Sequence, residues 1–157
     1  MRILALALVT LLVACSPAKP VAYSAAGIAV SEPFSRPAPA GGSGAGFFAI
    51  TNNNTGPDVL VAVESPVSAM VQLHESSVKG GIMRMEELKE GVPIKAGETI
   101  TFEPGARHVM FIRLGQALKA GDRIPATLVF RNAGRVPVEL VVQGRPAGAG
   151  GMEQHGH

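Results

Sequence analysis

The sequence predicts an all-β fold, a Greek-key sandwich or barrel of about nine short strands. From Gly27 onward, short apolar stretches alternate with breaks rich in Gly, Pro and Asn, as in chains of short strands and turns. No stretch shows a convincing amphipathic helical pattern, and 19 glycines and 12 prolines disfavour long helices. A length of 157 residues fits a single domain.

The N-terminal segment, residues 1–14, is predicted to be a lipoprotein signal peptide. It has a basic start and an apolar run over 4–14, which is shorter than the roughly 20 apolar residues needed to span a bilayer. The run ends in Leu-Val-Ala-Cys, which resembles a bacterial lipobox. We therefore expect cleavage before Cys15, lipidation of Cys15, and a linker over residues 15–25 that tethers the domain to the membrane.

Cys15 is the single cysteine of the chain, so its lipidation would leave no free thiol. Cysteine catalysis, disulfides and thiolate metal sites are then excluded. The expected compartment is the oxidising bacterial periplasm, and Ser16 after the cysteine favours anchoring in the outer membrane. The formal charge of +2 is small and scattered, which argues against nucleic-acid binding.

Residues 26–143 form the predicted β domain, and residues 144–157 form a predicted mobile arm. The break at Lys79-Gly80-Gly81 predicts a hairpin that returns the chain towards His74. The expected strands lie near 27–31, 46–52, 58–64, 69–75, 81–87, 98–103, 107–113, 125–131 and 135–142.

Histidine and methionine recur together in the predicted strands. His74 precedes the pair Met83 and Met85, and His108 and Met110 follow later in the chain. Residues two apart on a strand point to the same face, so each pair shares a face. If the third strand packs beside the hairpin, imidazoles and thioethers form one cluster with no carboxylate among the ligands.

Such a cluster favours copper. Thioether sulfur is soft and neutral and selects Cu(I), and imidazole also suits copper. The alternative is that these side chains only pack, because methionine on a strand is usually core filler. We interpret Met70 in that way.

At these residues the sequence resembles the periplasmic copper chaperones of the PCu(A)C family. The resemblance runs from Gly27 to Val142 and is strongest from Leu73 to Phe111. It implies a cupredoxin-like β-barrel. The segments that carry it are Leu73-His74-Glu75, Gly81-Ile82-Met83-Arg84-Met85, Ile94-Lys95-Ala96-Gly97, Pro104-Gly105-Ala106-Arg107-His108-Val109-Met110 and Leu118-Lys119-Ala120-Gly121-Asp122.

The resemblance also implies a set of Cu(I) ligands. They are His74, Met85, His108 and Met110, and Met83 is an alternative or additional ligand. One departure is Phe34, where relatives often have tryptophan, which concerns packing rather than the metal.

The C-terminal arm contains Met152, His155 and His157 and is similar to the His- and Met-containing extensions of some relatives. Two imidazoles on such an arm could bind Cu(II) or shield the main site. The alternative is an end without function.

The resemblance implies delivery of Cu(I) to the dinuclear copper centre of cytochrome c oxidase, or to a thiol-bearing assembly factor. We expect a monomer and not an enzyme, because no nucleophile–base pair stands out. Two alternatives stay open: a copper-buffering or resistance protein, and a structural or protein-binding lipoprotein in which these residues only pack.

Overall fold

The computed structural model describes residues 22–144, and this part of the chain forms eleven β-strands. No helix within residues 22–144 is long and apolar enough to cross a membrane. The strands are β1 (Ala22–Ala25), β2 (Ile28–Ser35), β3 (Gly44–Asn52), β4 (Asp58–Glu64), β5 (Ser68–Lys79), β6 (Ile82–Glu87), β7 (Val92–Ile94), β8 (Thr99–Phe102), β9 (Arg107–Leu114), β10 (Arg123–Phe130) and β11 (Arg135–Val142).

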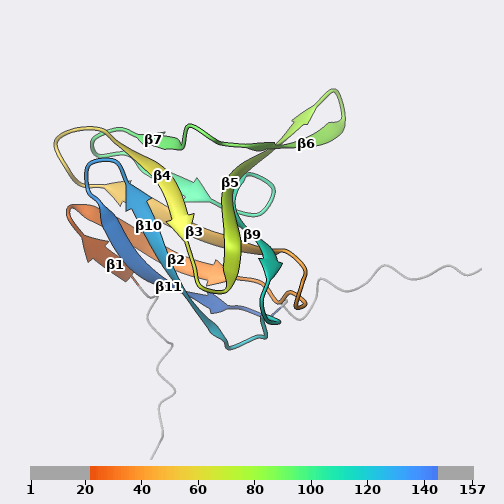
Figure 1. The fold of residues 1–157 in the computed structure, drawn as a ribbon. Helices are drawn as coiled ribbons and strands as arrows, with labels where there is room; N and C mark the ends of the chain where they lie inside the picture. Colours follow the sequence, from red (N-terminus) through yellow and green to blue (C-terminus); the bar gives the residue numbers. More distant parts are fainter. Residues whose placement is uncertain (1–21, 145–157) are drawn as a thin grey trace, which may run out of the picture.

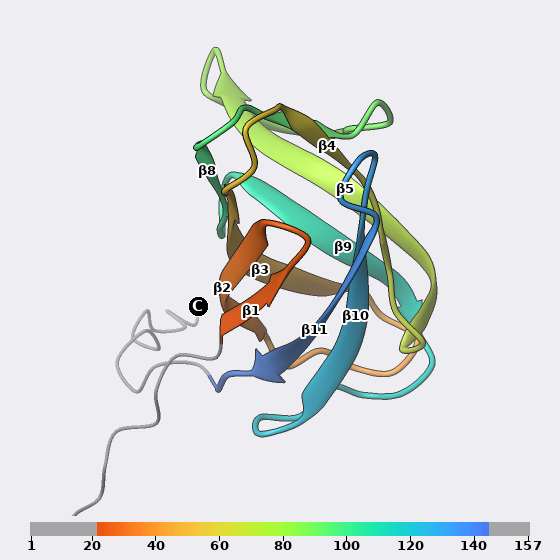
Figure 2. The ribbon, with the colours of Figure 1, turned by 90° about the vertical axis from the view of Figure 1, so that its left-hand side faces the viewer.

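The strands form one continuous sheet in the order β6-β5-β9-β3-β2-β11-β10-β4-β7, with β1 paired to β2 and β8 to β3. The sheet curls around a single interior, as Figure 2 shows. Most pairs are antiparallel, whereas β11 lies parallel to β2. Several neighbours, such as β3 and β9, are far apart in sequence, so the fold depends on long-range pairing.

The interior is filled by alternate residues of the strands. In β11, Val136, Val138, Leu140 and Val142 are buried while the residues between them are more exposed. Burying one such aliphatic side chain contributes about 1.5–3 kcal/mol. The buried hydrophobic residues of the described part are Ile, Val, Leu, Phe and Ala, with no Met among them.

All nine expected strands are present, but the structure adds β1 and β7. Residues 22–25 were expected in the linker, and this part of the prediction is wrong, because they form β1. Small side chains give β1 little apolar signal, yet Ala26 and Gly27 have positive φ angles of 49° and 74° and turn the chain back onto β2. β7 was missed because it is three residues long with Pro93 at its centre, a residue tolerated on an edge strand.

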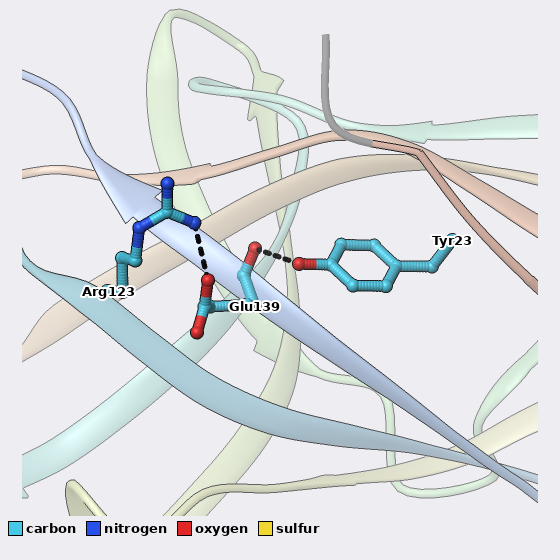
Figure 3. Close-up of polar contacts among 3 residues, drawn as sticks. All are labelled: Tyr23, Arg123 and Glu139. Atoms are coloured by element: carbon cyan, nitrogen blue, oxygen red, sulfur yellow. Dashed lines mark hydrogen bonds and ion pairs between the residues drawn. The ribbon is translucent and has the colours of Figure 1, made fainter.

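Polar contacts also hold β1 in place (Figure 3). The Tyr23 hydroxyl donates a hydrogen bond of 3.3 Å to the backbone carbonyl of Glu139 on β11. The carboxylate of Glu139 accepts from the Arg123 guanidinium on β10. The ordered domain therefore includes a segment that composition alone assigned to the tether.

The hairpin predicted at Gly80 and Gly81 is confirmed. Both glycines have positive φ, 61° and 76°, and Lys79 pairs directly with Ile82. β5 is longer than expected, reaching from residue 68 to 79. As a result, the end of the β5–β6 hairpin extends beyond the rest of the molecule (Figures 1 and 2).

Candidate metal centre

Strands β6, β5 and β9 lie side by side, and their outward face carries every His and Met of residues 22–144. Directly paired residues of antiparallel strands share a face. His74 pairs with His108, and Gln72 pairs with Met110. We call this surface the ligand face; it comprises Met70, Gln72, His74, Ser76 and Val78 on β5, His108 and Met110 on β9, and Met83, Met85 and Glu87 on β6.

The opposite face of β5 and β9 belongs to the core, whereas every residue of β6 is exposed. Leu73, Val109 and Phe111 alternate with the ligand-face residues and are buried in the hydrophobic interior. The core therefore fixes β5 and β9, and β6 is held by its pairing with β5. The strand alternation directs the imidazoles and thioethers away from the core.

The two imidazoles are adjacent. The ring centroids of His74 and His108 are 5.8 Å apart with an interplanar angle of 63°. His108 is only 7% exposed, and its Nδ1 lies 3.0 Å from the carbonyl oxygen of Ala106. A carbonyl can only accept, so Nδ1 carries the proton and Nε2 retains a lone pair.

His74 has a similar arrangement through its other nitrogen. Its Nε2 lies 3.0 Å from Oε1 of Gln72, which requires Nε2 to donate. Its Nδ1 is buried and has no hydrogen-bond partner among the described residues. A buried lone pair without a partner costs about 1–3 kcal/mol. Each imidazole thus has one anchored N–H and one nitrogen able to bind a metal, as in metal sites whose outer hydrogen bonds orient the ring.

Electrostatics keep His74 neutral. Burial lowers the pKa of His74 most, the neighbouring His108 lowers it further, and the negative charge of Glu87 opposes both; the net pKa is below the usual 6.5. A neutral imidazole is the form that binds a metal. At neutral pH this residue is therefore ready to act as a ligand.

The strand register separates the two methionines between which the sequence analysis left a choice. Met85 lies opposite Ser76, two residues from His74 on β5, whereas Met83 lies opposite Val78, four residues away. At the rise of a strand these offsets are about 7 and about 14 Å. Met85 is 51% exposed and Met83 is 68% exposed. The register therefore brings Met85 nearer to the imidazole pair.

Met110 lies on the other side of the pair. Its cross-strand partner is Gln72, so it is diagonal to His74 and is partly buried. The structure thus brings His74, His108, Met110 and Met85 onto neighbouring positions of one surface. Cys15, Met152, His155 and His157 lie outside the described residues.

The interpretation of Met70 as core filler is wrong. Met70 is 41% exposed and lies on the ligand face. Met70 and His74 are four residues apart on β5, and residues an even number apart on a strand point to the same face. This spacing in the sequence could have placed Met70 on the face of His74. Two further residues of the ligand face had no signal in the sequence. The role of Gln72 depends on a side-chain hydrogen bond to His74, and Glu87 lies opposite His74 through the strand register.

Within residues 22–144, no group of three or more His, Cys, Asp or Glu side chains is arranged to hold a metal ion. Two imidazole rings and two thioethers lie on neighbouring positions of the ligand face, and the exposed carboxylate of Glu87 lies opposite His74. The imidazoles and thioethers are neutral and include soft sulfur, and such donors suit Cu(I) better than a hard cation.

Comparison with known proteins gives a family match and one curated relative. A family model described as "Putative lipoprotein LpqE-like" matches residues 28–142. The "Putative lipoprotein Lxx21020" of Leifsonia xyli subsp. xyli (strain CTCB07) is 37% identical over 106 residues, which are 66% of this chain. The chain spans 64% of the length of that relative.

Solved structures with the same fold include three at low sequence identity. The copper-bound PCuAC domain from PmoF2 is 24% identical, with a TM-score of 0.66 over 80% of this chain and 99% of that domain. The apo PCuAC domain from PmoF1 is 24% identical, with a TM-score of 0.67 over 80% and 100%. The apo solution structure of DR1885 from Deinococcus radiodurans is 21% identical, with a TM-score of 0.54 over 93% and 98%. These likenesses confirm the predicted all-β, cupredoxin-like fold.

Proposed function

This chain belongs to the LpqE-like family, and from that premise we propose that it is a copper chaperone that binds Cu(I) on the ligand face. The observation that carries the proposal is the pair of adjacent imidazoles, His74 and His108, each with one anchored N–H and one nitrogen able to bind a metal. Met85 and Met110 complete the proposed ligand set.

The chemistry of this set supports Cu(I). All four ligands are neutral, so bound copper keeps its single positive charge and a second charge is disfavoured. Two neighbours of the same fold are described as copper-bound and CuI-bound, the PCuAC domain from PmoF2 and DR1885. The orphaned Nδ1 of His74 supports a metal at this place, because a Cu–N bond would satisfy a group that is otherwise costly to bury.

Differences in exposure suit transfer. His108 is buried and anchored to the backbone, whereas Met85 lies on the exposed strand β6. A donor on a projecting hairpin can be replaced first by a ligand of the acceptor while the imidazoles still hold the ion. Copper would then pass by stepwise exchange and never be released as a free ion.

We place this chaperone at the bacterial cell envelope. Cys15 would carry the lipid anchor, in the periplasm and preferably at the outer membrane, and the monomer would act without enzymatic activity. The acceptor is the dinuclear copper centre of cytochrome c oxidase or a thiol-bearing assembly factor. Met152, His155 and His157 would form a second, Cu(II)-binding group on the C-terminal arm.

Competition between the full chain and the Cu(I) chelator bicinchoninate tests the site. Replacing His108 and Met110 together by Ala removes two ligands, and we expect affinity to fall by about 100-fold, or about 2.8 kcal/mol. Val61→Ala is the control, because Val61 is an exposed apolar residue of β4 outside the ligand face. Equal affinity of the double variant and the wild type would refute the site.

Delivery needs its own test. In a deletion strain, the copper content of cytochrome c oxidase should fall, and the double variant should not restore it. If the deletion strain loads its oxidase with copper normally but tolerates less copper, the protein buffers copper and does not deliver it to the oxidase.

A further inference from the structure

Methionine is segregated in this protein. Leu, Ile, Val, Phe and Ala fill the interior, whereas all four methionines of residues 22–144 lie on the ligand face. Methionine ordinarily fills gaps in cores because its side chain is flexible and apolar. Packing therefore does not explain where these thioethers are, and Met70 belongs to the same pattern as the proposed ligands.

Met70 lies directly beyond Met110. Met70 pairs with Ile112, and Met110 pairs with Gln72, so the two methionines are diagonal neighbours across β5 and β9. Diagonal pairs are about 7–8 Å apart, which long side chains bridge. The other diagonal neighbour of Met110 on β5 is His74. Met110 is thus positioned between the imidazole pair and Met70.

His108, Met110 and Met70 become progressively more exposed to solvent. Exposure rises from His108 through the partly buried Met110 to Met70, which is exposed. An exposed strand position ordinarily takes a β-branched or polar residue, and methionine gains little there from packing. A thioether at the rim of a soft-metal site has a chemical use in exchanging the metal.

We propose that Met70 is a transfer ligand for Cu(I), a metal-contacting residue through which the ion enters and leaves the site. The proposal rests on the function proposed above. A bond forms between Sδ of Met70 and Cu(I) while the bond to Met85 or to an imidazole nitrogen breaks, and Met110 stays bound throughout. Copper remains Cu(I), and no proton moves because thioethers do not titrate.

Transfer kinetics test this role. Met70→Leu keeps the volume and apolar character of the side chain and removes the sulfur. Loading of the full chain with Cu(I), and unloading to excess bicinchoninate, are followed by stopped flow beside the equilibrium affinity. We expect both rates to fall by about tenfold, because the transition state for exchange would lack one Cu–S bond, and the equilibrium affinity to stay unchanged. A ligand that binds copper only during transfer speeds both loading and unloading. Its removal should therefore slow both rates by the same factor.

Val61→Leu is the matched control, since Val61 has comparable exposure on β4 away from the ligand face. Unchanged rates in Met70→Leu would overturn the proposal. A tenfold slowing that is accompanied by a loss of affinity would also overturn it, because Met70 would then be a permanent ligand. Failure of the wild-type chain to bind Cu(I) would instead refute the proposed function, so the two failures are distinguishable.

Discussion

Two buried polar sites in this protein have opposite arrangements. Asp58, at the start of β4, is 3% exposed, and its carboxylate is fully engaged. Its Oδ1 accepts hydrogen bonds from the backbone N–H groups of Val59 at 2.7 Å and Asn132 at 2.9 Å, and its Oδ2 accepts from Ala133 at 2.8 Å. This carboxylate fastens the turn between β10 and β11 to β4.

The His74–His108 pair, in contrast, uses only part of its hydrogen-bonding capacity. Each ring anchors one nitrogen, and the Nδ1 of His74 is buried without a partner among residues 22–144. A buried polar group that stabilises the fold has its hydrogen-bond partners within the fold, as Asp58 does. A buried nitrogen left without a partner is costly to the fold, and binding of a ligand would offset that cost.

The largest expected effect on stability is at Asp58. Asp58→Ala leaves three backbone donors without their acceptor, and we expect the free energy of unfolding to fall by about 3 kcal/mol. Chemical denaturation measures this. Cu(I) affinity of the folded fraction should not change. Glu64→Gln is the control, because Glu64 is an exposed carboxylate paired with Arg135 and should contribute little.

The dependence of the free energy of unfolding on pH, in the acid range, provides a second test of the role of Asp58. Burial alone would raise the pKa of Asp58, but its backbone hydrogen bonds outweigh burial and lower the pKa below the usual value. The stabilisation is therefore present above about pH 3.9 and is lost as the pH falls from there through the folded pKa. A wild type and an Asp58→Ala variant that lose stability equally over this range would contradict the role.

The next largest expected effect is on Cu(I) affinity, and it distinguishes Met85 from Met83. Met85→Leu should weaken Cu(I) binding by about tenfold, or about 1.4 kcal/mol, because the register places Met85 beside the imidazole pair. Met83→Leu, on the same strand and on the same face, is the matched variant and should have a smaller effect. Chelator competition measures both, and a larger loss in Met83→Leu would reverse the assignment.

The smallest effect sharpens the contrast between the two buried sites. His74→Leu removes the unsatisfied nitrogen, so we expect the metal-free protein to gain about 1 kcal/mol in the free energy of unfolding while Cu(I) binding weakens. Thermal or chemical denaturation without copper checks this. A destabilised His74→Leu protein would mean that the imidazole serves the fold, as Asp58 does.

Local patterns predicted most of the fold and part of the site. The turn residues located nine strands and the Gly80-Gly81 hairpin, and period-two spacing placed His108 and Met110 on one face. The pairing of β5 with β9, which sets His74 opposite His108, joins segments more than thirty residues apart and has no local signature.

Other features were hidden for different reasons. Small side chains concealed β1, and the usual role of methionine as core filler concealed Met70. The unsatisfied nitrogen of His74 depends on side-chain hydrogen bonds that only coordinates reveal.

X-ray absorption at the copper K-edge, on the full chain loaded with one equivalent of Cu(I), tests the central claim most directly. We predict a mixed shell of imidazole nitrogen and thioether sulfur around copper, and the Met110→Leu variant should lose sulfur from that shell. A shell of nitrogen and oxygen alone, or copper that remains in solution, would contradict it.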